Sequence, residues 1–448
     1  MRKRRHDAAT LSEIQPESAL PPPGAPPRVL RILAYILLAG AFLTPLVVSL
    51  DGHDHFRLPK QLVLYAVAII ALAVTAIALV LEKVQLDRNG RLLAKFAAGG
   101  LAWALVTVVL STNRTLSVEA FVWAAALTAV FFVAAISFRD VRVEVVAIAV
   151  LVPAVVNAVI LTLQTFDVWN PWVFPTSTST RATHNALLGN PDDVGGYLAF
   201  PLLFACALML YAKRWRLLYA AVVIVLGLAL LMTQTITAIG SFAIAFAVMG
   251  IRWNPRTGTA VAAAGAILLL AGSLLYDPLQ VRLLYLAGAV ERGEWGRVVS
   301  GRLVPYATAW QMFLDHPVTG VGPGAFKFHY LPYVFKVETA SPTLAKLSGT
   351  QRVNFHQAHN DHLQLLAETG VLGYLAVLAA IFYVATVWRR TPRSDDERVT
   401  VARALALPLC VLLLLVMVAQ FVLQLAAPAY ACILLGGACL AWSKRDVA

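Results

Sequence analysis

The chain has 448 residues, of which 59% are hydrophobic and 13% are charged, about half the charged fraction of an average soluble domain. This composition and a mean hydropathy of +0.73 exclude an ordinary soluble globular domain and predict a polytopic membrane protein. The net charge of +12 does not indicate nucleic-acid binding, because the basic residues lie in short links between apolar runs, where they set membrane topology.

The chain begins with a basic, proline-rich segment. Residues 1–28 start with MRKRR and continue through PPPGAPP. This pattern predicts a disordered cytoplasmic tail, and it is not a signal peptide, because it has no short apolar stretch with a cleavage site.

Twelve apolar runs of membrane-spanning length follow the tail, and they predict an all-α protein. The runs are 29–50, 60–81, 92–110, 118–138, 143–166, 195–212, 216–233, 235–251, 259–276, 363–388, 399–424 and 428–442. We therefore expect transmembrane helices 1–9 in residues 29–276 and helices 10–12 in residues 363–442. A loop at 277–362 separates the two groups, and residues 443–448 form a second cytoplasmic tail.

The basic residues orient these helices. If the amino terminus is inside, the inner links include EKVQLDRNGR, AKRWR and RRTPRSDDER, whereas the short outer links hold only Arg57, Lys60, Arg114 and Arg181. The positive-inside rule then predicts cytoplasmic termini and an outer loop at 277–362. That loop is too long for an unstructured connection, so we expect it to be folded and functional.

One helix of the loop is visible in the sequence. Residues 301–316 (GRLVPYATAWQMFLDH) carry apolar side chains at helical spacing, which predicts an amphipathic helix at the membrane interface with Trp310 at headgroup depth. The helix should end before Pro317. The following VTGVGPGAF is a glycine-proline turn and lacks the Lys-Ser/Thr pair of a phosphate-binding loop.

A histidine cluster lies where the loop returns to the membrane. His356, His359 and His362 fall within seven residues, and Glu368 follows. One histidine can act as a general base, since imidazole titrates near neutral pH, with Asn360 and Asp361 orienting its ring. A zinc site and a purely structural role are the alternatives. We expect no metal and no cofactor, because His-Glu-x-x-His is absent and the four cysteines lie inside apolar runs.

Three basic residues are expected near the outer face. Arg181 lies in the outer segment 167–200, which also holds interfacial aromatic residues and the turn GNPDDVGGY. With Lys60 and Arg302 it can bind a diphosphate, which arginine grips through two parallel hydrogen bonds. The alternative for each residue is a charge that snorkels to the membrane surface.

Several short pieces resemble the O-antigen ligase and polymerase superfamily of bacterial membrane glycosyltransferases. The resemblance covers most of residues 40–390. It is carried by Pro59-Lys60, by Gly189-Asn190-Pro191 with Gly196-Tyr197-Leu198, by Arg302, Trp310, Pro317 and Gly320-Val321-Gly322-Pro323-Gly324, and by His359-Asn360, Leu363-Gln364 and Glu368-Thr369-Gly370.

The resemblance implies a fold similar to the C-type membrane glycosyltransferases and a metal-independent, inverting transfer of a glycan from undecaprenyl diphosphate. The acceptor it implies is the lipid A-core oligosaccharide at the periplasmic face. It makes His359 the base on the acceptor hydroxyl and Arg302 the ligand of the diphosphate. Further substrate-binding candidates are the residues Arg181, Lys60, Asn190, His356, Asn360 and Glu368.

One position departs from the family pattern. Members usually have Thr-Gln-Ser-Arg after the seventh helix, whereas this chain has Thr233, Gln234, Thr235 and Ile236. Arg181 or an arginine of the loop is expected to replace the missing cation. A polymerase or a protein O-oligosaccharyltransferase of the same superfamily is the alternative function, and an envelope-glycan transporter or a non-catalytic scaffold is a more remote one.

Overall fold

A computed structural model describes most of the chain. The described residues are 28–50, 54–81, 86–170, 184–253, 258–260, 263, 265, 267, 271–272, 274–348 and 354–443. Every regular element in this described part is a helix, which confirms the all-α prediction.

Seven of the helices are long and apolar enough to cross a membrane. They are α2 (Arg57–Val80), α3 (Arg88–Leu110), α4 (Arg114–Ser137), α5 (Val143–Thr165), α6 (Pro191–Tyr211), α15 (Asp361–Ala385, continued by α16, Val387–Arg390) and α17 (Glu397–Val416). Four shorter apolar helices accompany them: α1 (Arg28–Leu43), α7 (Arg216–Met232), α8 (Ile236–Trp253) and α18 (Ala426–Trp442). The protein is therefore a multi-pass membrane protein.

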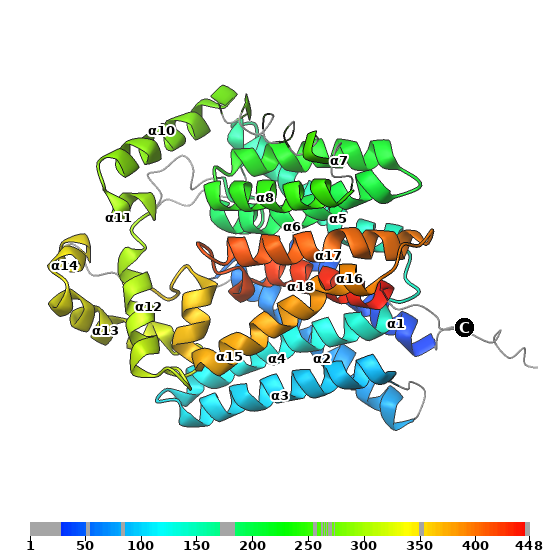
Figure 1. The fold of residues 1–448 in the computed structure, drawn as a ribbon, viewed down its shortest axis with the longest axis horizontal. Helices are drawn as coiled ribbons and strands as arrows, with labels where there is room; N and C mark the ends of the chain where they lie inside the picture. The colour runs from blue at the N-terminus through cyan, green and yellow to red at the C-terminus, as the bar shows by residue number, and fades with distance from the viewer. Residues whose placement is uncertain are drawn as a thin grey trace, which may run out of the picture.

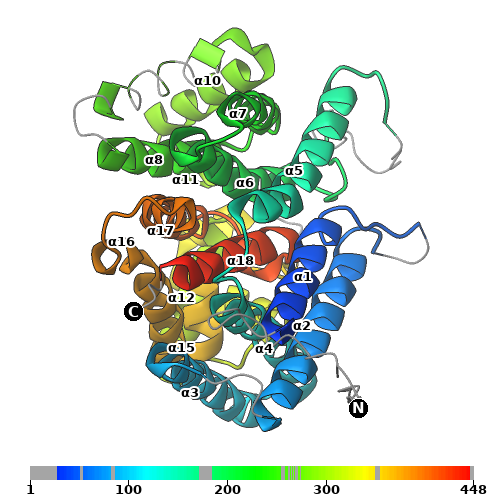
Figure 2. The ribbon, with the colours of Figure 1, turned by 90° about the vertical axis from the view of Figure 1, so that its right-hand side faces the viewer.

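The long helices run side by side along the longest axis of the molecule (Figure 1). Among the seven long helices α6 is the most enclosed, with 83% of its apolar window buried, whereas α3 is peripheral, with 11%. Viewed from the end of the bundle, α6 and α18 lie among the other helices (Figure 2). Helix α1 begins and α18 ends at this same end of the bundle (Figure 2).

Residues 277–348 form a helical cap at the opposite end of the bundle (Figure 1). Its described helices are α10 (Asp277–Glu291), α11 (Trp295–Val298), α12 (Leu303–Asp315), α13 (Phe326–Ala340) and α14 (Pro342–Ser348). Val304, Met312, Phe326 and Tyr330 belong to a second hydrophobic core, separate from that of the bundle. The described part of the predicted loop is therefore folded, and its location on the outer side of the membrane stays a prediction.

Helix α12 matches the predicted amphipathic helix within two residues at its start. The face of α12 that carries Trp310 and Leu314 is exposed, whereas the face that carries Val304, Ala309 and Met312 is buried. The apolar side chains recognised in the sequence therefore lie on the exposed face of the helix. An exposed apolar face is what an interfacial helix requires. Contact of Trp310 with lipid headgroups stays a prediction.

Helix α15 is broken at Gly370, whose backbone has φ 67° and ψ −173°, a conformation that is almost exclusive to glycine. A Cβ atom there would lie 2.0 Å from the carbonyl oxygen of Val318. Residues 317–325 form a glycine-rich loop that packs against this break. Three hydrogen bonds join the two: Val371 N donates to Pro317 O (2.9 Å), Val321 N to Ala367 O (2.8 Å) and Gly322 N to Glu368 O (3.0 Å). The loop thus supplies partners for backbone groups that the break exposes.

Replacement of Gly370 by alanine tests the importance of this break. We expect Gly370→Ala to destabilise the protein by about 3 kcal/mol or more, because the substitution adds a backbone clash to a strained conformation. The measurement is the thermal unfolding midpoint of the purified protein in detergent.

The matched control is Gly227→Ala in α7, where an added Cβ meets nothing within 4 Å. It should change stability by at most about 1 kcal/mol, and in the stabilising direction, since alanine is the better helix former. Equal unfolding midpoints for the two variants would contradict the role given to the break.

Candidate active site

Two adjacent carboxylates open helix α6, and each pairs with an arginine from a distant part of the chain. Asp192 Oδ2 lies 3.4 Å from Arg302 Nη2, and Asp193 Oδ2 lies 3.2 Å from Arg57 Nη2. Asn190 caps the helix by accepting a hydrogen bond from the backbone N–H of Asp192 at 2.8 Å. Carboxylates are favoured in the first turn by the helix dipole. This turn therefore brings two guanidinium groups to one end of the bundle.

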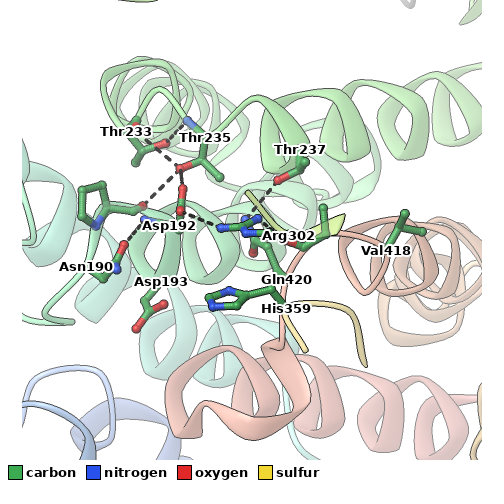
Figure 3. Close-up of polar contacts among 12 residues, drawn as sticks. Asn190, Asp192, Asp193, Thr233, Thr235, Thr237, Arg302, His359, Val418 and Gln420 are labelled. Atoms are coloured by element: carbon green, nitrogen blue, oxygen red, sulfur yellow. Dashed lines mark hydrogen bonds and ion pairs between the residues drawn. The ribbon is translucent and has the colours of Figure 1, made fainter. Parts of the chain in front are cut away.

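The guanidinium of Arg302 has a further partner, and the carboxylate that it pairs with is itself held (Figure 3). Its Nη1 donates to the carbonyl oxygen of Ala419 at 2.7 Å. Its partner Asp192 also accepts a hydrogen bond from Thr235 Oγ1 at 3.1 Å. Only 17% of the Arg302 side chain is exposed. The guanidinium is therefore fixed in position while it still has access to solvent.

His359 lies next to Arg302 and points towards the first turn of α6 (Figure 3). Its backbone is left-handed, with φ 55°, a conformation that is uncommon for a residue other than glycine and is often found at functional sites. Tyr306 of α12 donates to the carbonyl oxygen of His359 at 3.3 Å. The ring of Phe421 packs edge-on at 4.8 Å between centroids. His359 is thus held through its backbone from the cap and through its ring by Phe421.

The surroundings of His359 favour its neutral form. Burial lowers the pKa of the imidazole from 6.5 to about 4, and the nearby charges of Arg302 and Arg57 act in the same direction, while Asp192 opposes them. At neutral pH the ring is therefore uncharged and able to accept a proton.

The link between α17 and α18 is a part of the site that the sequence did not reveal. Residues 417–425 supply the carbonyl of Ala419 and the ring of Phe421, which also lies 5.4 Å from the Arg57 guanidinium carbon. Gln420 donates to Thr237 at 3.3 Å. This link was concealed because it interrupts a nearly continuous apolar stretch, with Gln420 and Gln424 as its only polar signal.

Arg57, Asp192 and Asp193 were also not singled out from the sequence. The two aspartates were interpreted only as part of a turn, and Arg57 as one of the few basic residues of the short outer links. A pair of adjacent carboxylates at a predicted helix start, in a chain with so few charges, is the signal that would have pointed to them.

Lys60 is buried near the start of α2, with 4% of its surface exposed. Its ammonium group donates to the carbonyl oxygen of Val47 at 2.7 Å and lies 5.8 Å from the ring of Phe56. The structure thus gives Lys60 protein partners, and its predicted role in substrate binding stays a prediction. Arg181 lies outside the described residues.

Asn360 and Asp361 have structural partners in place of the His359 ring. Asn360 caps α15 by accepting from Leu363 N at 3.0 Å, and Asp361 accepts from Leu423 N at 3.0 Å. The expectation that these two side chains orient the imidazole is therefore not supported; Tyr306 and Phe421 surround His359 instead.

Glu368 is buried and holds the glycine-rich loop. Its carboxylate accepts hydrogen bonds from Gly324 N at 2.9 Å, Phe326 N at 3.3 Å and Gln364 Nε2 at 3.0 Å. These contacts account for the Glu-x-Gly motif structurally, since Gly370 forms the adjacent break. A role of Glu368 in substrate binding stays a prediction.

The other two histidines of the cluster have different surroundings. His362 is bonded to Tyr374 Oη at 3.1 Å and to the carbonyl oxygen of Leu414 at 2.9 Å, so both ring nitrogens have protein partners. His356 is exposed, and its predicted role in substrate binding stays a prediction. Among the described residues no group of three or more metal-ligating side chains is present.

The arrangement combines two functions at one end of the apolar bundle. Two guanidinium groups can bind an anion with several oxygen atoms, such as a phosphate or a diphosphate. A neutral imidazole beside them can remove a proton from a hydroxyl group. Together they suit a transfer reaction in which a hydroxyl attacks and an anion leaves.

Comparison with known protein families gives one match. Residues 221–378 match a family described as O-antigen ligase. This segment includes Arg302, His359, Glu368 and the Thr233–Ile236 turn, whereas Arg57, Asp192 and the 417–425 link lie outside it. No curated protein matches the chain.

The ionisation of His359 provides a test of this geometry. In a 15N-histidine NMR titration of the protein in detergent, we expect the His359 signal, identified by its loss in His359→Gln, to change with a midpoint near pH 4. Burial and the arginines both disfavour the imidazolium, so the ring should stay neutral from pH 7 down to that midpoint.

Arg302→Gln should raise this midpoint, because it removes one of the nearby positive charges. The midpoint should remain below 6.5, because burial, the larger cause, persists. A wild-type midpoint near 6.5, or no change in Arg302→Gln, would contradict the proximity of the two side chains.

Proposed function

We propose that this chain, a member of the O-antigen ligase and polymerase superfamily by its domain at residues 221–378, transfers a glycan from undecaprenyl diphosphate to a hydroxyl of the lipid A-core oligosaccharide. The observation that carries the proposal is the neutral imidazole of His359 beside the guanidinium groups of Arg302 and Arg57. The reaction takes place at the periplasmic face of the inner membrane, with both termini cytoplasmic, and needs neither a metal nor a cofactor.

His359 is the general base in this mechanism. Its ring accepts the proton of the acceptor hydroxyl as the oxygen attacks the anomeric carbon of the donor glycan. The bond between that carbon and the diphosphate oxygen breaks, and the electron pair leaves with undecaprenyl diphosphate. Attack from the side opposite the leaving group inverts the anomeric centre.

Arg302 and Arg57 bind the diphosphate and stabilise the negative charge that builds up as it leaves. Arg57 takes the place of the family arginine that is missing at Ile236. In support, Ile236 follows Thr235, which bonds Asp192, so position 236 adjoins the turn that holds both arginines. A second cation from the start of α2 thus compensates for the one that α8 lacks.

Donor binding also raises the basicity of His359. A diphosphate near the two arginines adds negative charge, which favours the imidazolium and raises the low pKa of the free protein. The carboxylates of Asp192 and Asp193 hold the arginines until the diphosphate competes for them. The base therefore becomes stronger only when the donor is present.

The lipopolysaccharide banding pattern of a deletion strain tests the function directly. Loss of the ladder with accumulation of lipid-linked polymer supports a ligase. A single repeat attached to the core indicates a polymerase, and a normal pattern with loss of a protein-linked glycan indicates a protein O-oligosaccharyltransferase.

Removal of the base should abolish transfer. We expect His359→Ala to lower kcat by about 10²- to 10⁴-fold, the usual effect of losing a general base, in a transfer assay with purified protein and lipid-linked donor. His316→Ala is the control, because His316 is an exposed residue that ends α12. Activity of His359→Ala close to that of this control would refute the assignment.

The pH profile tests the effect of the donor. For the wild type, kcat/KM should fall on the acid side only towards pH 4, where free His359 becomes protonated. The acid limb of kcat should lie at higher pH, because it reports the donor complex. If the acid limbs of kcat and of kcat/KM fell at the same pH, the proposed rise in the basicity of His359 on donor binding would be contradicted.

Conservative replacement of the arginines tests their geometry. We expect Arg302→Lys and Arg57→Lys each to lose roughly 10²-fold or more in kcat, because a point charge cannot make the bidentate contact with a phosphate. Arg114→Lys is the control, since Arg114 is an exposed arginine that also opens a membrane helix. Full activity of Arg57→Lys would leave Arg302 as the sole diphosphate ligand of the two.

A further inference from the structure

A cavity of about 460 Å³ lies in the cap, outside the site described above. It is bounded by α10, by the turn between α11 and α12, and by α14, which neighbour one another in the cap (Figure 1). Leu347 of α14 closes one side, where it packs so closely on Gly296 that an added Cβ would lie 2.7 Å from it. The volume is within the range of about 300–1,000 Å³ that is typical of small-molecule sites.

The walls of the cavity combine cationic, hydroxyl and aromatic groups. Arg282 and Arg297 supply two guanidinium groups, Ser300 a hydroxyl, and Tyr285 an aromatic ring with a second hydroxyl. Guanidinium groups bind phosphates and carboxylates, and an amphipathic ring such as that of tyrosine offers both an apolar face and a hydrogen-bonding tip. This set suits a sugar that carries a negative charge.

The cavity shares a turn with the candidate active site. Ser300 and Gly301 line it and have left-handed backbones, with φ 54° and 77°, and Arg302 follows directly. The guanidinium of Arg302 reaches away to Asp192 and Ala419. The cavity and the diphosphate-binding side chain therefore lie on two sides of one short segment.

We propose that this cavity binds an anionic saccharide, that is, a sugar bearing a phosphate or a carboxylate. Resting on the proposed function, we assign it to the acceptor glycan, since the diphosphate of the donor is held on the other side of the turn. A saccharide bound there lies against the backbone that positions Arg302, so acceptor binding and the placement of this arginine are linked.

Binding of a charged oligosaccharide to the purified full-length protein tests the proposal without any turnover. The probe is delipidated core oligosaccharide with its phosphates intact, measured by isothermal titration calorimetry in detergent and without donor. We expect Arg282→Gln and Arg297→Gln each to weaken binding about tenfold, the usual effect of losing one charge-assisted contact. Oligosaccharide from which a phosphatase has removed the phosphates should bind the wild-type protein about as weakly as the untreated oligosaccharide binds these two variants.

Arg292→Gln is the matched control. Arg292 is an exposed arginine from the same part of the cap, and it pairs with Glu294 at 3.4 Å, as Arg297 does at 3.1 Å, but it does not line the cavity. Its replacement should leave binding unchanged. Equal binding by the Arg282, Arg297 and Arg292 variants, or equal binding of treated and untreated oligosaccharide, would overturn the proposal.

Two competing ligands distinguish which kind of molecule carries the anionic group that the cavity binds. Displacement of the core oligosaccharide by the free glycan of the donor would keep the anionic-saccharide site but overturn its assignment to the acceptor. Displacement by phosphatidylglycerol in nanodiscs, at a concentration where neutral lipid has no effect, would make it a lipid headgroup site and overturn the proposal.

The test is independent of the proposed function. Intact binding in a protein that transfers no glycan would refute the transfer reaction and the acceptor assignment but leave the saccharide site standing. Intact transfer with unaltered acceptor KM in Arg282→Gln and Arg297→Gln would refute the site and leave the reaction standing.

Discussion

The ion pair between Asp192 and Arg302 is the contact on which the arrangement of the site depends. It joins α6, the most enclosed of the seven long helices, to the segment that enters α12 of the cap. Arg302 also bonds Ala419, so three distant parts of the chain meet at one guanidinium. A partly buried ion pair adds little net stability, since desolvation offsets attraction. Its effect is to fix the cap on the bundle in one position.

This constraint also determines the electrostatics around His359. The carboxylates of α6 attract two arginines, and these arginines, together with burial, keep the imidazole neutral. The same residues thus set the position of the cations and the protonation state of the imidazole. Tyr306 of the cap bonds the backbone carbonyl of His359, and Phe421 of the 417–425 link packs on its ring. The site therefore requires the whole fold even though the family match covers only residues 221–378.

Sequence reasoning was most successful where a pattern is local. The all-α class and helix α12 agreed with expectation. The closeness of Arg302 to His359, which are far apart in sequence, was expected only through the family resemblance. Roles that depend on long-range contacts were missed: Arg57 pairs with a residue 136 positions away, which no local pattern reveals. The 417–425 link was concealed within an apolar stretch. Asn360 and Glu368 look like substrate-binding residues in sequence, because a capping amide and a buried carboxylate that holds a loop are the same residue types as those of a binding site.

The break at Gly370 has a consequence for protein engineering. Because Pro317, Val321 and Gly322 bond directly to the backbone around the break, the glycine-rich loop and the start of α15 form a single folding module. A chimera that exchanges acceptor specificity between relatives should therefore place its downstream junction after Val371, inside the apolar segment, and not at the apparent membrane boundary near His362. A graft that ended earlier would combine the glycine-rich loop of a relative with the native break at Gly370. The hydrogen bonds between the loop and the break would then be lost.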